Sequence, residues 1–154
     1  MKYDGLWKTA LVAGAMLMLA ACGGPTIRVG LSSNANLNLN ANSEPLPVVV
    51  RIYQLSDRAA FDNATFADIW KRDNAVLGNA LLTRNEVVMN PSAQSEVEFD
   101  RHAQARYVGV AAIFRSPVES KWRAVYELSD NWLGKKLPSS FSVSLVGNTL
   151  HITD

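Results

Sequence analysis

The side chains that could carry chemistry are few in this 154-residue chain, and they are scattered along it. The two histidines, His102 and His151, lie far apart, and neither has an acid or a thiol at metal-ligand spacing. We expect His102 in a solvated turn and His151 on the outer face of a strand. Helix caps and solvated connections account for the clustered aspartates, which are Asp57, Asp62, Asp68 and Asp73.

Sequence motifs of the common enzyme classes are missing. The chain contains no Gly-x-Ser-x-Gly, no phosphate-binding Gly-x-x-x-x-Gly-Lys loop and no Gly-x-Gly-x-x-Gly. We therefore predict that the protein is not an enzyme, and we expect no metal, no cofactor and no small-molecule substrate.

The lone cysteine, Cys22, follows the only long apolar run of the chain, Ala10 to Ala21. A short charged lead precedes this run, which is too short to span a bilayer, since a spanning helix needs about 20 apolar residues. This arrangement predicts a secretory signal over residues 1–21. The end of the run, Leu19-Ala20-Ala21-Cys22, resembles a bacterial lipobox, in which the thiol receives a diacylglycerol and cleavage makes the cysteine the first residue. An ordinary signal peptide that ends near a cysteine is the alternative.

Acylation of Cys22 would attach the mature chain to a membrane and would remove its only free thiol. Its sulfur would carry diacylglycerol and its amino group a further acyl chain such as palmitate, which leaves no thiol for a disulfide. Residues 22–25 form a short linker that reaches about 10–14 Å when extended. Gly23 stands where enterobacterial lipoproteins retained in the inner membrane have Asp, so we expect the periplasmic face of the outer membrane.

The mature part has the length and charge of one neutral domain. Removing residues 1–21 from the chain leaves 133 residues, which suits a single domain over 26–154. The formal charge of +1 on the whole chain falls to zero without the signal, so nothing in the charge indicates nucleic-acid binding.

Alternating hydrophobicity dominates the domain and predicts an all-β fold. We expect about eight short strands in a two-sheet β-sandwich, with a closed barrel as the competitor. The expected strands are 26–35, 48–55, 86–90, 96–100, 106–115, 122–128, 140–145 and a return strand that contains Leu150 and Ile152. Gly147-Asn148 predicts a type II′ hairpin turn between the last two.

A helical insertion is expected at about 57–82, where the periodicity changes. Thr65-x-x-Asp68 resembles a capping box, and Asn74 is a candidate cap for a second short helix. We expect Trp70 and Trp122 in the core. Trp132 follows in a loop, where we expect it to cover a sandwich edge, with a partner contact as the alternative.

Residues 34–42 form a low-complexity run of Asn, Ala and Leu. A flexible spacer is one interpretation. The other is a partner-binding loop, because Leu37 and Leu39 would be costly to expose to water without a function. From the residues alone, both remain open.

Taken in order, several segments resemble the type VI secretion outer-membrane lipoprotein family, known as TssJ or SciN. They are the lipobox, Pro47-Val-Val-Val-Arg-Ile-Tyr-Gln-Leu55, the spacing of Phe61, Phe66 and Trp70, Val76-Leu77-Gly78, Tyr107-Val-Gly-Val-Ala-Ala-Ile-Phe-Arg115 and Lys121-Trp122-Arg123. The resemblance covers nearly all of the mature chain. One departure is Pro91-Ser92, where the family more often has Pro-Gly.

The resemblance implies a transthyretin-like sandwich with a small helical addition and no enzymatic role. It implies that the protein anchors the membrane complex of the secretion machine by binding the periplasmic C-terminal domain of the IcmF-like (TssM) inner-membrane subunit. By position, it places the contact in the loop between the first two strands, at Leu37, Asn38, Leu39, Asn40, Ala41, Asn42 and Ser43. Replacing both Leu37 and Leu39 by Asp is expected to weaken this contact without unfolding the protein.

Two other functions remain as alternatives. One is a pilot or chaperone lipoprotein that serves a different envelope assembly. The other is a lipid-anchored protein that binds a small ligand, which requires a deep cleft with converging polar groups.

Overall fold

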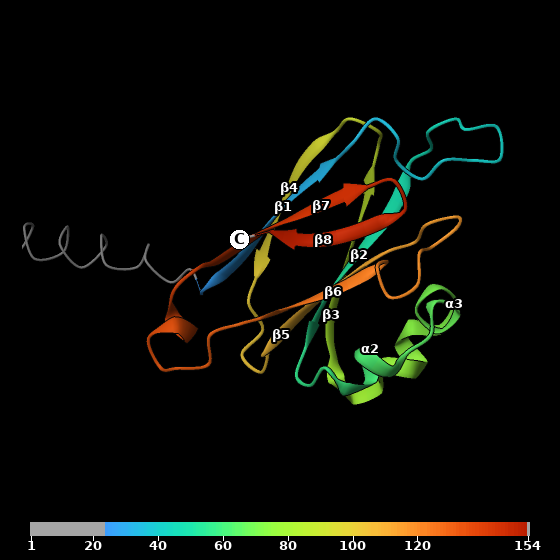
Figure 1. The fold of residues 1–154 in the computed structure, drawn as a ribbon. Helices are drawn as coiled ribbons and strands as arrows, with labels where there is room; N and C mark the ends of the chain where they lie inside the picture. The colour runs from blue at the N-terminus through green and yellow to red at the C-terminus, as the bar shows by residue number, and fades with distance from the viewer. Residues whose placement is uncertain (1–23, 154) are drawn as a thin grey trace, which may run out of the picture.

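The computed structural model describes residues 24–153, which form two four-stranded sheets packed face to face (Figure 1). The first sheet has the order β4-β1-β7-β8 and the second the order β3-β2-β5-β6. This is the predicted β-sandwich of eight strands. Among the described residues, no helix is long and apolar enough to cross a bilayer.

The first sheet is built around β1 (Thr26–Ser33), which pairs in antiparallel fashion with β4 (Gln94–Asp100) and in parallel with β7 (Ser139–Val146). Strand β8 (Thr149–Thr153) completes the sheet beside β7. Alternation explains β1, because its odd-numbered residues are buried against the other sheet and its even-numbered ones face outward. The strand ends at Ser33 rather than at Ala35, since the backbone turns into a hydrogen-bonded loop at Asn34.

The second sheet is antiparallel throughout and has β2 (Val48–Leu55) near its centre, between β3 (Leu81–Met89) and β5 (Tyr107–Ala112). Strand β6 (Arg123–Glu127) forms the edge beside β5. Strand β2 is covered on both faces, as its density of apolar and β-branched residues predicts. Strand β3 begins at Leu81, five residues earlier than expected, because its whole length pairs with β2.

The hairpin between β7 and β8 has the predicted turn. Gly147 has a φ of +59°, whereas Asn148 is not among the residues with positive φ, and a type II′ turn requires this combination.

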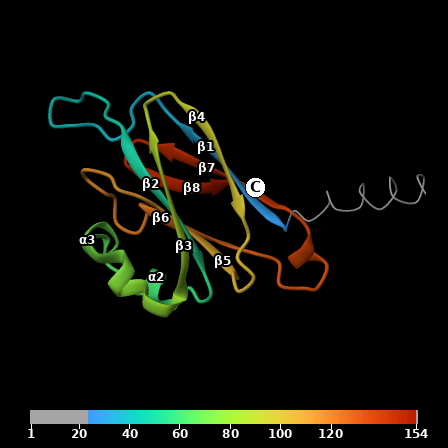
Figure 2. The ribbon, with the colours of Figure 1, turned by 180° about the vertical axis from the view of Figure 1, so that it is seen from behind.

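The helical insertion, α2 (Ala59–Asn63), α3 (Phe66–Leu77) and the 3₁₀ turn η2 (Gly78–Ala80), lies against the outer face of the second sheet (Figures 1 and 2). Thr65 and Asp68 form the predicted capping box, with reciprocal hydrogen bonds of 3.2 and 3.0 Å. These bonds, with that from Arg72, lower the pKa of Asp68 to about 2, the backbone amide of Thr65 having the largest effect.

The predicted second helix is instead the continuation of α3 beyond a kink. Arg72 has φ −152° and ψ 35° within α3, so the two helical parts are joined without a separate cap at Asn74. The side chain of Arg51 on β2 donates from Nη1 to the carbonyls of Ile69 and Trp70 just before the kink, at 2.7 and 3.1 Å. The sheet therefore supplies partners for the carbonyl groups next to the interruption.

The expected burial of the tryptophan side chains is confirmed for only one of them. Trp122 is buried as predicted, but Trp70 is 50% exposed and Trp132 is 74% exposed. The buried stripe of α3 passes through Ile69 and Leu77, and Trp70 lies about 100° around the helix from Ile69, at the edge of that stripe. Trp132 lies in the loop before the short 3₁₀ turn η3 (Gly134–Lys136), and most of its side chain is exposed.

Candidate functional site

The loop between β1 and β2, residues 34–47, projects from the end of the sandwich opposite the point where the described chain begins. Figures 1 and 2 show this loop and the N-terminal end of β1 on opposite sides of the molecule in both views. It is the loop to which the family resemblance assigns partner binding.

Asn34 fixes the base of the loop. Its N–H donates to the carbonyl of Leu145 at 3.0 Å, and its Oδ1 accepts from the N–H of Gly147 at 3.1 Å. Its carbonyl accepts from the N–H of Ser92 at 3.1 Å. One residue thus joins the loop to the β7–β8 turn and to the β3–β4 turn.

Asn38 is the buried centre of the loop. It is 5% exposed and has a φ of +51°, a conformation that Asn tolerates better than most residues. Its Nδ2 donates to the carbonyl of Pro47 at 2.9 Å, and its Oδ1 accepts from the N–H of Arg115 at 2.8 Å. Its own N–H donates to the carbonyl of Gly147 at 2.9 Å. The flexible-spacer interpretation is therefore wrong, since this loop is held by directed hydrogen bonds on three sides.

Leu37 is also buried, with an exposed fraction of 0%, and it belongs to the hydrophobic core. Its carbonyl accepts from the N–H of Leu46 at 3.0 Å, which closes the loop upon itself. Leu39 is half-buried. The expectation that Leu37→Asp with Leu39→Asp spares the fold is wrong, because a carboxylate at position 37 would be buried without a partner.

The tip of the loop is organised by Asn40. Its Oδ1 accepts from the N–H groups of Asn42 and Glu44 at 2.8 and 3.0 Å, and its Nδ2 donates to the Glu44 carboxylate at 2.7 Å. This ring of hydrogen bonds presents a set of exposed residues, namely Ala41, Asn42, Ser43, Glu44 and Pro45. Of the seven loop residues that the family resemblance assigned to the partner contact, only Ala41, Asn42 and Ser43 are exposed.

Apolar side chains near the loop were missed by the sequence reasoning. Val118 lies in the β5–β6 connection and Val146 at the end of β7, and they are 42% and 47% exposed. Asn38 forms hydrogen bonds with the backbone of the segments that carry these two valines, at Arg115 and at Gly147. Sequence periodicity does not reveal this grouping, because the three segments are far apart in the chain. A rigid polar tip with apolar residues beside it suits recognition of a protein surface and offers no group for catalysis.

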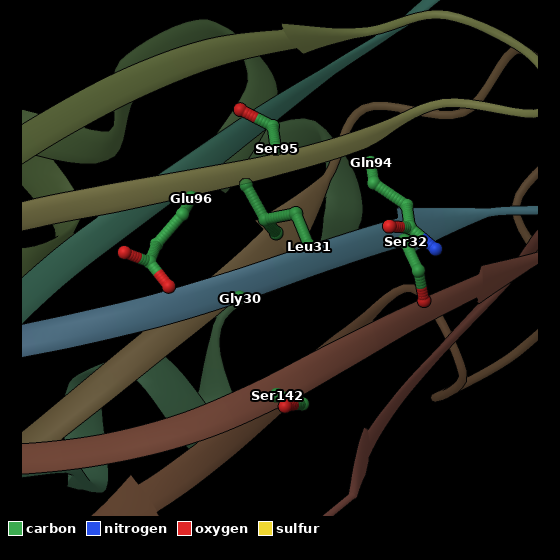
Figure 3. A pocket seen from close by; sticks show the side chains of 7 residues that line it. All are labelled: Gly30, Leu31, Ser32, Gln94, Ser95, Glu96 and Ser142. Atoms are coloured by element: carbon green, nitrogen blue, oxygen red, sulfur yellow. The ribbon is translucent and has the colours of Figure 1, made fainter.

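A surface depression lies elsewhere, on the outer face of the first sheet (Figure 3). It has a volume of about 430 Å³ and forms where Gly30 of β1 has no side chain between β4 and β7. Its only carboxylate, that of Glu96, is paired with Arg28 at 3.3 Å. The remaining lining residues are Leu31, Ser32, Gln94, Ser95 and Ser142. This lining lacks the converging charged groups of a catalytic or cofactor site.

The other sequence candidates are not brought together. His151 is exposed on β8, and His102 lies half-buried in the β4–β5 turn, where its Nδ1 accepts from the N–H of Gln104 at 3.1 Å. Over residues 24–153, no three His, Cys, Asp or Glu side chains are grouped to hold a metal ion. Cys22 lies outside the described residues.

Comparisons with known proteins identify the same family as the residue pattern. A family model, T6SS-SciN, described as type VI secretion lipoprotein, VasD, EvfM and TssJ, matches residues 25–146. A search of curated proteins gives no match.

Solved structures share the fold. The type VI lipoprotein TssJ1 of Pseudomonas aeruginosa has a TM-score of 0.74 at 22% identity, over 85% of this chain and 96% of that one. Serratia marcescens Lip, a membrane-bound component of the type VI secretion system, has a TM-score of 0.77 at 19% identity, over 84% and 97%.

Two further matches are to structures whose descriptions name other parts of the type VI secretion system. One is in a structure described as the TssM C-terminal domain (869–1107) from EAEC, with a TM-score of 0.71 and 26% identity, over 84% of this chain and 98% of that one. The other is in a structure of a type VI membrane complex, with a TM-score of 0.74 and 28% identity, over 86% and 100%. With the family model matching most of its length, this chain belongs to the type VI secretion lipoprotein family.

Proposed function

We propose that the protein anchors the type VI secretion membrane complex to the outer membrane, through acyl chains on Cys22 at one end and a protein contact at the other. The proposed partner is the periplasmic C-terminal domain of the IcmF-like (TssM) inner-membrane subunit. The observation that carries the proposal is the rigid loop 34–47, whose exposed tip points away from the end where the chain emerges at Gly24 (Figure 1).

The lengths of the matched chains support this choice of partner. In the TssM C-terminal domain structure, the match uses 84% of this 154-residue chain and covers 98% of the matched chain. The matched chain is therefore about as long as the mature part of this protein, and much shorter than a domain that runs from residue 869 to residue 1107. We take that structure to hold a chain of this fold together with the TssM domain. The match in a type VI membrane complex agrees with the same role.

The hydrogen bonds within the loop favour tight recognition. A flexible loop loses about 0.5–1.5 kcal/mol for each side chain that binding immobilises, in addition to the cost of ordering its backbone. Here Asn34, Asn38 and Asn40 already fix the backbone before any partner arrives. Less of the free energy gained from contacts at the tip is then needed to order the loop, which favours a higher affinity.

Binding of the tip is tested with the detergent-solubilised acylated protein and the TssM C-terminal domain of the same bacterium. We expect Ala41→Arg with Asn42→Arg to weaken the dissociation constant by about tenfold or more, because these exposed residues would meet the partner directly. The matched control is Ala103→Arg with Gln104→Arg, in an exposed turn near Pro25, and it should bind as the unaltered protein does.

Equal affinity for all three proteins would overturn the loop assignment. Selective capture of a different envelope protein would favour the pilot or chaperone role instead. The anchor is tested separately, since Cys22→Ser should release the protein into the soluble periplasmic fraction, and its continued fractionation with the outer membrane would overturn lipid anchoring.

A further inference from the structure

Three of the large exposed apolar side chains lie close together in one short loop between β6 and β7. Trp132, Leu133 and Leu137 are 74%, 52% and 51% exposed, and Lys135 and Lys136 lie between them in η3. We call these five residues the Trp132 patch. The proposed partner contact does not use them, because they lie on the opposite side of the molecule from loop 34–47 (Figures 1 and 2).

The patch lies beside the start of the described chain. Arg101 makes the connection, because its N–H donates to the carbonyl of Pro25 at 2.8 Å and its guanidinium donates to the carbonyls of Gly134 and Ser129 at 3.4 and 2.9 Å. The strand that follows the patch begins at Ser139, which is paired with Ile27. The loop and the N-terminal segment are therefore fixed to each other.

Cys22 is only three residues before Pro25, a reach of about 10 Å even when the chain is extended. If Cys22 carries acyl chains, the lipid headgroups must come within that distance of Pro25, and Arg101 joins the loop to Pro25. A bilayer is thus the surface that this patch meets first.

The composition of the patch fits an interface between lipid and water. Trp is enriched at membrane interfaces because its ring is apolar and its N–H is polar, and Lys places its stem on apolar surface with its ammonium among headgroups. The Lys136 ammonium lies 5.4 Å from the centroid of the Trp132 ring. Arg106 adds a further cation nearby, and Asp130, at 4.0 Å from it, is the acidic group facing it.

We propose that the Trp132 patch inserts into the headgroup region of the phospholipid leaflet that holds the acyl chains. The contact fixes the tilt of the sandwich, so that loop 34–47 points away from the membrane. This inference rests on the proposed acylation of Cys22. Acyl chains alone would hold the domain at a single point, about which it could rotate, and a second contact removes this freedom.

The experiment uses the full acylated protein reconstituted into phosphatidylethanolamine–phosphatidylglycerol vesicles with brominated acyl chains, which quench tryptophan at close range. We expect quenching in the unaltered protein and a fall of about twofold or more in Trp132→Phe. The matched control is Trp70→Phe, which removes the other exposed tryptophan of the mature chain and should leave the quenching in place.

Lys135→Glu with Lys136→Glu should reduce the quenching in vesicles that contain phosphatidylglycerol, because the patch would then repel the anionic headgroups. Circular dichroism of each variant checks that the fold is kept. Unchanged quenching in Trp132→Phe, or its loss in Trp70→Phe, would overturn the proposed contact. Flotation of the same vesicles distinguishes failure of the lipid anchor from failure of the Trp132 contact. A protein that does not float with the vesicles overturns lipid anchoring. A protein that floats but shows no quenching of Trp132 overturns the proposed contact alone.

Discussion

At the scale of single residues, Asn38 determines the shape of the candidate binding loop. Its side chain satisfies one backbone acceptor and one backbone donor that are remote in sequence, at Pro47 and Arg115. Its positive φ of +51° turns the chain at the same point. The low-complexity run of asparagines therefore has a structural explanation, because Asn combines tolerance of this conformation with one donor and one acceptor group.

We predict that Asn38→Ala destabilises the protein by about 2 kcal/mol, since it removes two part-buried hydrogen bonds to the backbone and places Ala at a positive φ. Urea denaturation measures the change, and faster amide exchange in residues 40–46 would show that the loop is loosened. Asn42→Ala serves as the control, because Asn42 is exposed and should change stability by less than about 0.5 kcal/mol. A stability of Asn38→Ala equal to that of the control would contradict the assigned role.

At the scale of elements, two arginines attach the helical insertion to the second sheet. Arg123 of β6 donates to the carbonyls of Phe61, Asp62 and Ala64 at 2.5–2.6 Å, at the C-terminal end of α2. Arg51 of β2 binds the carbonyls beside the kink of α3 and also Asp73, at 3.3 Å. The short helices have few internal hydrogen bonds, so these contacts with the sheet hold them in place.

Asp73 is the buried centre of this attachment. Its carboxylate accepts from the Tyr53 hydroxyl at 2.9 Å and from Arg84 at 2.9 Å. Burial acts to raise the pKa of Asp73, but hydrogen bonds from Tyr53, the Asn74 amide and Arg84 outweigh it and hold the pKa below its ordinary value. Burial and the neighbouring carboxylate together raise the pKa of Tyr53, so its hydroxyl stays protonated and donates.

Replacing Asp73 by Asn should destabilise the fold by about 3 kcal/mol at pH 7, because the part-buried Arg51 and Arg84 would both lose the more buried of their charged partners. Since the folded pKa of Asp73 is depressed, its contribution is present above the unfolded value of about 3.9 and is lost as the pH falls below it. Thermal unfolding between pH 7 and pH 3 should therefore show a weaker acid dependence in the variant.

The control for this prediction is Glu86→Gln, which removes a partly exposed partner of Arg51 at 3.0 Å and should cost less than about 1 kcal/mol. If both variants lost the same stability, or if Asp73→Asn kept the full acid dependence, the charge of Asp73 would not hold the insertion.

Much of the element structure could be predicted because it depends on local patterns. Strict alternation located β1 and β7, the apolar run of β2 gave its bounds, and the Thr65–Asp68 spacing gave the start of α3. The attachment by Arg51 and Arg123 could not be predicted, because Arg51 binds carbonyl groups 18 and 19 residues away and Arg123 binds carbonyl groups 59 to 62 residues away. Local patterns do not specify such pairs.

The sequence indicated which loop is the candidate site, but not which of its side chains are exposed. The family resemblance located the loop, whereas its exposed and buried residues depended on contacts with two distant turns. Leu37 is buried because the loop closes over the end of the sandwich, and the sequence alone did not distinguish this from an exposed anchor. The exposure of Trp132 could not be predicted either, because the position of a residue in a loop does not determine whether its side chain is buried.

At the scale of the whole molecule, the length of the sandwich separates the two proposed contacts. The N-terminal segment and the Trp132 patch occupy one end, and loop 34–47 with Val118 and Val146 occupies the other (Figures 1 and 2). The β1–β7 and β1–β4 pairs run between them as continuous hydrogen-bonded ladders. Continuous ladders of this kind would resist stretching between the two proposed contacts, which suits the proposed anchoring role.

Site-specific photo-crosslinking in intact cells tests this arrangement most directly, with the crosslinking amino acid introduced at Asn42 in one variant and at Trp132 in another. We predict a covalent product with the TssM-type inner-membrane subunit from position 42 and none with that subunit from position 132. A product with that subunit from position 132, with none from position 42, would contradict the account.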